Sequence, residues 1–205
     1  MARERELKLA LTADEAARLA AALGPPERRI RQVNHYLDTG ERSLGRLGFS
    51  LRLRAEDEAR HTLALKGPAH RRAAVVDRLE EERSVSPDEA TLILERGVDR
   101  GSLGLPLPPP VAALDPRTLF VAWGRLENER RVFARGALVL ELDRSLFPDG
   151  TIDHEMEAEL GDDPDPLVEA ALGDLRALLE RAGVGWVPQR KGKLQRLLSR
   201  GGRPR

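Results

Sequence analysis

The stretch ERELK at residues 4–8 places a charged side chain at every second position, and EMEAE at residues 155–159 does the same near the other end of the chain. Successive side chains of a β-strand point to opposite faces. Glu4, Glu6 and Lys8 therefore share one face of a predicted strand, and the three glutamates of the second stretch share a face of another. The opposite face of the first strand carries Leu7 and Leu9, which must be buried, so this strand is predicted to bury one face in a core and carry charge on the other.

The composition limits what such a protein can do. The 205 residues are enough for one domain, and 34 basic residues balance 34 acidic ones, which argues against general nucleic-acid binding. The chain has no cysteine, and only two tryptophans, one tyrosine and four phenylalanines. It also begins with charged residues and lacks an apolar run of membrane-spanning length. We therefore expect a cytoplasmic protein without a membrane or a specific nucleic acid as partner.

Alternating patterns and turn signals predict eight strands, mostly antiparallel. The strands are expected at residues 3–11, 30–38, 49–54, 61–66, 74–85, 119–134, 137–143 and 151–160. Capping signals and amphipathic periodicity predict helices at residues 13–23, 87–96 and 165–182, with a short helical turn at residues 41–47. Residues 1–198 are expected to form the domain, and residues 199–205 a basic disordered tail. The expected fold class is α+β, a closed eight-stranded antiparallel β-barrel with surrounding helices.

Charge is sorted among the predicted strands. Carboxylates gather on the first, seventh and eighth strands, whereas arginine and lysine dominate the middle ones. One interpretation is a solvated sheet face on which these charges pair. The other is a confined site, in which crowded carboxylates repel one another and bind a divalent cation while the basic groups bind phosphates.

A series of short motifs decides between the two interpretations. ERELK is followed by NHYLDT at residues 34–39, LRLR at 51–54, TLALKG at 62–67, RLEEE at 78–82, Arg130, LD at 142–143 and EME at 155–157. In this order the motifs resemble those of the CYTH, or triphosphate tunnel metalloenzyme, superfamily. The resemblance implies an eight-stranded barrel that binds triphosphates together with Mg2+ or Mn2+. Members of this superfamily include inorganic triphosphatases, thiamine triphosphatases, RNA triphosphatases and class IV adenylyl cyclases.

The resemblance also implies residue roles. The metal ligands would be Glu4, Glu6, Asp143, Glu155 and Glu157, with Glu159 as either a further ligand or a rim residue. The catalytic basic groups on the phosphates would be Lys8, Arg52, Arg54, Lys66 and Arg130. Arg78 would bind substrate too, unless it simply pairs with Glu80, and Lys193 would do so unless it belongs to a solvated basic tail. Asn128 departs from the family pattern, which commonly has a basic residue at this position.

The expected function is metal-dependent hydrolysis of the terminal phosphate of a triphosphate, with inorganic triphosphate favoured because aromatic residues are few. Two alternatives remain, a class IV adenylyl cyclase that makes cyclic AMP from ATP and a non-catalytic polyphosphate- or nucleotide-binding module. The protein is expected to be a monomer or a homodimer.

Overall fold

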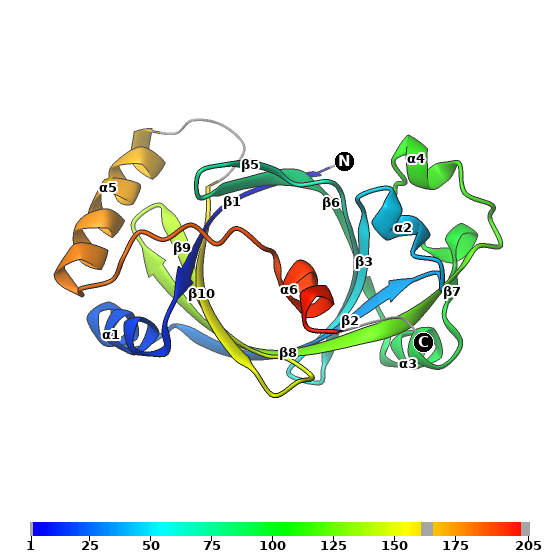
Figure 1. The fold of residues 1–205 in the computed structure, drawn as a ribbon, viewed down its shortest axis with the longest axis horizontal. Coiled ribbons are helices and arrows are strands. Elements are labelled where there is room, and N and C mark those ends of the chain that lie inside the picture. The colour runs from blue at the N-terminus through cyan, green and yellow to red at the C-terminus, as the bar shows by residue number, and fades with distance from the viewer. Residues whose placement is uncertain (1, 161–165, 202–205) are drawn as a thin grey trace.

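The computed structural model describes residues 2–160 and 166–201, and eight antiparallel strands in it close into a barrel (Figure 1). In order around the barrel these are β1 (Ala2–Leu11), β10 (Ile152–Glu159), β9 (Leu138–Leu146), β8 (Leu119–Arg135), β2 (Arg28–Asp38), β3 (Ser50–Glu56), β4 (Arg60–Lys66) and β6 (Val75–Val85). The barrel closes because β1 pairs with β10 along one edge and with β6 along the other. The predicted fold class is confirmed.

Helices cover two opposite sides of the barrel (Figure 1). On one side lie α1 (Ala13–Leu23) and α5 (Pro166–Arg181), and on the other lie α2 (Ser43–Arg46), α3 (Pro87–Arg96) and α4 (Pro109–Ala112). The predicted capping box at the start of α1 is present: the Glu15 amide donates to Thr12 Oγ1 at 3.2 Å, and the Thr12 amide donates to Glu15 Oε2 at 2.8 Å.

Strand parity separates the cores from the barrel interior. Leu7 and Leu9 of β1 pack with Met156 of β10 against the helices of one side, in a core outside the barrel. A second outer core, which contains Leu51 and Leu53 of β3, lies on the opposite side. The alternate positions of the same strands therefore point inward, and these are the positions where the sequence places its charges.

The sequence did not predict a helix in the C-terminal segment. Residues 193–199 form a helix, α6 (Lys193–Ser199), which lies in the opening of the barrel ring (Figure 1). Ser199 closes this helix instead of opening a disordered tail, and Arg200 Nη2 lies 2.7 Å from Asp153 Oδ1. The remainder of the predicted tail, residues 202–205, lies outside the described residues.

The prediction also missed several short elements. They are β5 (His70–Arg72), which pairs with β6, β7 (Val98–Asp99), which pairs with β8, the 3-10 helix η1 (Arg100–Ser102), and α4. The predicted helical turn at residues 41–47 shortens to α2, and α5 begins at Pro166, since residue 165 lies outside the described residues.

The connection from α5 to α6 is anchored along its length. Arg18 of α1 donates to the carbonyl oxygens of Ala182 and Gly183, at 3.0 and 2.9 Å. Further on, the Ala10 amide donates to the Val187 carbonyl oxygen at 2.8 Å, so the connection lies along the part of β1 that does not pair with β6. These bonds direct α6 to the barrel opening. In the described part of the chain, no helix is both long and apolar enough to cross a bilayer.

Candidate functional site

Three buried carboxylates of neighbouring strands meet inside the barrel. Asp143 of β9 lies directly opposite Glu155 of β10 in the strand register, and Glu157 is the next inward-pointing residue of β10. One oxygen from each lies within 4.8 Å of the others, and the three residues are between 1% and 5% exposed. We call Asp143, Glu155 and Glu157 the carboxylate triad. A set made only of carboxylate oxygens is the kind that Mg2+ and Mn2+ prefer, so the donor chemistry fits such an ion.

Lysine and arginine neutralise the carboxylate triad in this structure. Arg130 of β8 donates two hydrogen bonds to Asp143, at 2.8 and 2.6 Å, and one to Glu157, at 2.9 Å. Lys8 Nζ lies 2.7 Å from Glu157 Oε1. Burial pushes the pKa of Asp143 upward, but Lys193 and Arg130 hold it well below its usual range. In this structure lysine and arginine thus pair with carboxylates that would otherwise only repel one another, a role that the sequence analysis gave to a divalent cation.

The other predicted metal ligands do not belong to the triad, although Glu6 shares the Lys8 ammonium with Glu157. Glu4 is bound by Lys66, at 2.8 Å, and by Arg78, at 2.6 Å. Glu6 pairs with Lys8 at 3.0 Å. Glu159, the last residue of β10, is exposed. A role of these three glutamates in metal binding stays a prediction.

A wall of positive charge faces the interior from β3 and β4. Burial, together with the neighbouring Arg52 and Arg130, lowers the pKa of Arg54 to about 10. Burial and the nearby Arg78 and Arg52 lower the pKa of Lys66 to about 8. Within the described chain, the buried Nε of Arg52 has no hydrogen-bond partner, and Arg52 Nη2 is 3.9 Å from Glu80. We call Arg52, Arg54 and Lys66 the basic wall, and its crowded positive charge suits a polyanion.

Asn128 shares the inward face of β8 with Arg130 and is buried in a row of neutral hydrogen bonds. Its amide nitrogen donates to Gln32 Oε1 at 2.9 Å, and Ser145 Oγ donates to Asn128 Oδ1 at 2.9 Å. The amide therefore points into the barrel, as expected of the position at which the family commonly has a basic residue.

Sequence reasoning missed two charged residues near the triad, one that contacts it directly and one that contacts its partner Arg130. Arg196 of α6 contacts Glu155 at 2.6 Å and Asp153 at 3.0 Å. Glu141 of β9 contacts Arg130, and its pKa rises to about 7, because burial and the nearby Glu157 outweigh the effect of Arg130. The sequence signal for α6 was the pair Leu194 and Leu197, whose three-residue spacing is typical of one face of a helix but which lies in a basic segment.

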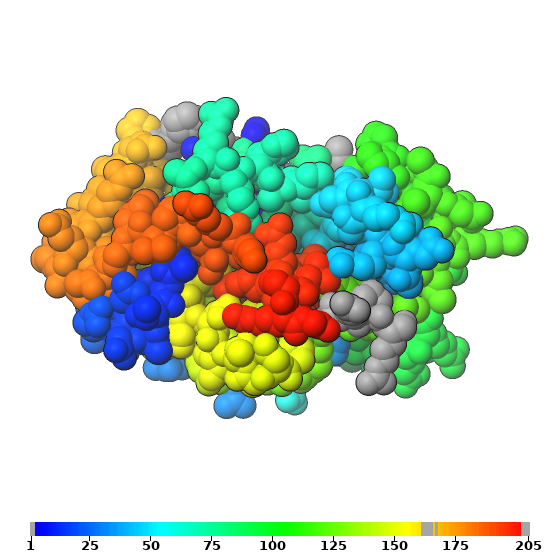
Figure 2. All heavy atoms as spheres, in the orientation of Figure 1, coloured from blue at the N-terminus to red at the C-terminus, as the bar shows by residue number. Residues whose placement is uncertain are grey.

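Aromatic residues gather where α6 meets the strands. The Tyr36 and Trp123 rings lie 6.3 Å apart, and Tyr36, Leu126 and Phe147 pack around Leu197 of α6. In the space-filling view α6 (red) is seated between the strands and loops of this face (Figure 2). Three of the seven aromatic residues of the chain, Tyr36, Trp123 and Phe147, thus lie at the barrel opening that α6 occupies.

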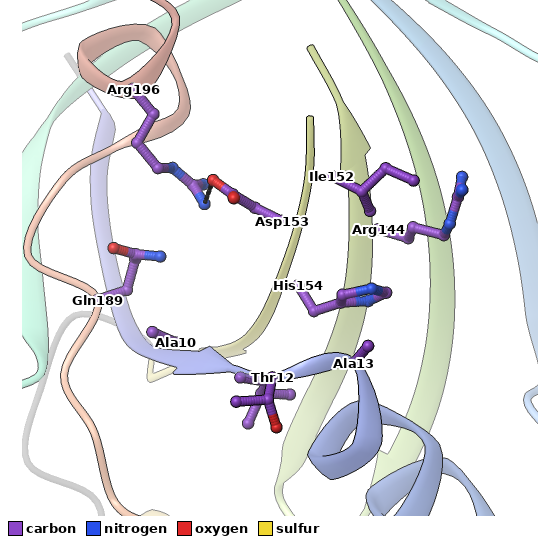
Figure 3. Close-up of a pocket in the computed structure, with 10 residues that line it drawn as sticks. Ala10, Thr12, Ala13, Arg144, Ile152, Asp153, His154, Gln189 and Arg196 are labelled. Carbon is purple, nitrogen blue, oxygen red and sulfur yellow. Dashed lines mark hydrogen bonds and ion pairs between the residues drawn. The ribbon is translucent and has the colours of Figure 1, made fainter. Parts of the chain in front are cut away.

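A cavity of about 490 Å³ lies beside this opening, between the end of β1, the start of α1 and strands β9 and β10 (Figure 3). Its lining includes Thr12, His154, Gln189 and Arg196. No residue of the carboxylate triad or the basic wall lines it, so we do not assign the candidate site to this cavity.

With this geometry in place, comparisons with known proteins identify the family. A CYTH domain model matches residues 2–182, and the chain therefore belongs to the CYTH family. No curated protein sequence matches the chain significantly.

Solved structures with the same fold cover almost the whole chain. One is a putative adenylyl cyclase, HpAC1 from Hippeastrum, described as having a dominant triphosphatase activity, with 25% identity, a TM-score of 0.80 and coverage of 96% of this chain and 95% of that one. Another is a putative adenylate cyclase from Bacillus halodurans, with 26% identity, a TM-score of 0.68 and coverage of 96% and 98%. The PH1819 protein from Pyrococcus horikoshii, at 20% identity, shares the fold with a TM-score of 0.65 over 97% and 99% of the two chains.

Proposed function

We propose that this protein is a divalent-metal-dependent hydrolase that removes the terminal phosphate of a triphosphate. The observation that carries the proposal is the pairing of two opposite features in one barrel interior. An oxygen-only carboxylate triad lies on β9 and β10. The basic wall lies on β3 and β4, and two of its members, Arg54 and Lys66, have lowered pKa values. The similarity to HpAC1, which has a dominant triphosphatase activity, supports this choice among the chemistries that CYTH folds host.

In this proposal the acidic residues would bind the metal and the basic residues would bind the phosphates. Asp143, Glu155 and Glu157 would hold Mg2+ or Mn2+, with Glu4, Glu6 and Glu159 as further candidate ligands. When bound, the metal would neutralise phosphate charge and lower the pKa of an attacking water. The basic groups proposed to stabilise charge on the transferred phosphoryl group are Lys8, Arg52, Arg54, Lys66 and Arg130, while Arg78 and Lys193 would bind the rest of the phosphate chain.

The proposed substrate is inorganic triphosphate. An organic triphosphate remains the second candidate, because Tyr36 and Trp123 offer apolar surface next to the charged interior. In that case a cyclase reaction on ATP would become possible, as the names of two similar structures suggest. A binding module without turnover is the third candidate, and the neutral Asn128 is the feature that favours it.

A substrate panel tests these candidates. Tripolyphosphate, ATP and thiamine triphosphate would each be incubated with Mg2+ or Mn2+, and phosphate, pyrophosphate and cyclic AMP would be quantified. We expect fastest release of phosphate from tripolyphosphate. Cyclic AMP and pyrophosphate from ATP would identify a cyclase instead, and binding of all three substrates without any product would identify a binding module.

A further inference from the structure

The α6 helix places an ammonium group inside the carboxylate triad. Lys193 Nζ lies 2.8 Å from Asp143 Oδ2 and 2.9 Å from Glu157 Oε1, and it also contacts Glu155. In the described part of the chain, the triad is the only group of three or more metal-ligating side chains close enough to share one ion. The position that an ion would take among these oxygens is therefore held by a lysine.

Three ion pairs and an apolar contact hold α6 in this place. Arg196 reaches Glu155 and Asp153, and Arg200 reaches Asp153 at 2.7 Å. Leu197 is 1% exposed and packs on Tyr36 and Phe147 at the barrel opening. A Cβ atom at Gly124 of β8 would lie 2.9 Å from Leu197 Cδ2, so the glycine leaves the room that this leucine needs.

The anchored connection before α6 keeps Lys193 close to the triad even when its ion pairs break. Gln189, four residues earlier, donates its amide to the Lys8 carbonyl oxygen at 2.9 Å. A group tethered so near its site has a high effective concentration there. A second cation among the same oxygens would meet strong like-charge repulsion from the lysine, because the site is buried.

We propose that Lys193 is a built-in competitor of the divalent cation, and that a metal ion binds the carboxylate triad only when α6 releases this lysine. The proposal rests on the proposed function for the identity of the cation. In the metal-bound state the released ammonium is available to phosphate oxygens, which is the substrate-binding role that the family resemblance implies for Lys193. The apparent association constant of the metal then equals the intrinsic constant multiplied by the fraction of molecules in which Lys193 is not docked in the triad.

Binding of Mn2+ to the full-length protein without substrate tests this proposal. Free Mn2+ would be measured by electron paramagnetic resonance in the parent, Lys193→Met and Leu197→Ala, with melting curves to confirm folding. Lys191→Met is the matched control, because Lys191 is exposed and two residues away. We expect Lys193→Met to bind Mn2+ about tenfold more tightly, which corresponds to a lysine docked in about nine of ten parent molecules. We expect no change in Lys191→Met.

Leu197→Ala separates competition from a general change of potential, since it removes no charge and only loosens α6. It should also tighten Mn2+ binding. Unchanged or weaker binding in Lys193→Met would overturn the proposal, and so would tightening in Lys193→Met alone. If Lys193→Met does not fold, Leu197→Ala decides by the same criterion.

The readout is independent of turnover. A protein that hydrolyses no triphosphate but binds Mn2+ more tightly as Lys193→Met would retain this inference and refute the proposed function. An active triphosphatase whose Mn2+ affinity is unchanged in both variants would refute this inference and retain the proposed function.

Discussion

Replacing Glu157 with glutamine should destabilise the metal-free protein. The Glu157 carboxylate touches three buried cations: Lys8 at 2.7 Å, and Arg130 and Lys193 each at 2.9 Å. Burial pushes the pKa of Glu157 upward, but Lys193, Lys8 and Arg130 hold it well below its usual value. A carboxyl whose pKa is lowered on folding contributes stability at neutral pH, and this stability is lost as the pH falls through its folded-state pKa. Glutamine lacks that charge at every pH.

The size of the effect follows from the partners that remain. Removing one member of a buried ion pair costs about 3–5 kcal/mol. Each of the three cations keeps another carboxylate, since Lys8 also contacts Glu6, and both Arg130 and Lys193 also contact Asp143. We therefore expect the lower end, about 3 kcal/mol. For a chain of this size that lowers the melting temperature by about 6–12 °C.

Thermal melts in excess chelator would measure the change, with Glu159→Gln as the control. Glu159 lies on the same face of the same strand but is exposed, so its replacement should change stability by no more than about 0.5 kcal/mol. If Glu157→Gln melts at or above the parent temperature, the carboxylates repel one another more than the cations attract them. The ion-pair description of the site would then be refuted.

Three further predictions concern catalysis on tripolyphosphate. The kcat/KM should fall as the pH rises through about 8, because Lys66 then loses its proton, and Lys66→Arg should move this fall to higher pH. Asn128→Lys should lower the melting temperature, because Gln32 Oε1 and Ser145 Oγ lose their buried hydrogen bonds to the Asn128 amide, at a cost of about 1–3 kcal/mol. It should nevertheless lower KM by adding a cation, and an unchanged KM would mean that the new charge does not reach the substrate. Arg130→Ala should reduce kcat and raise KM together, and steady-state kinetics showing only a KM effect would exclude a role in the transition state.

The barrel could be predicted because strand parity is a local property of the sequence. Glu4 and Leu7 are assigned to opposite faces by the spacing of their positions alone, and the same holds for Arg52 and Leu51. The sequence also indicated that acidic and basic residues lie on different strands, and in the structure these strands carry the carboxylate triad and the basic wall.

The pairing inside the barrel could not be predicted, because it depends on how strands far apart in sequence meet once the barrel closes. Lys66 lies 62 residues from Glu4, yet the two side chains form a hydrogen bond of 2.8 Å. A helix as short as α6 has little intrinsic stability, so its docking depends on Leu197 and on ion pairs with β10, which no local pattern reveals. For the same reason the position of Lys193 within the triad, and the isolation of Glu159 from it, became visible only in three dimensions.

Metal-dependent triphosphate hydrolysis is tested most directly by phosphate release from tripolyphosphate after removal and return of the metal. The protein would be treated with excess EDTA, assayed, dialysed and assayed again with Mg2+ or Mn2+. We predict no release above the uncatalysed rate in EDTA and full recovery with either ion, in a reaction that Asp143→Asn abolishes. Undiminished phosphate release in excess EDTA would contradict a metal role for the carboxylate triad.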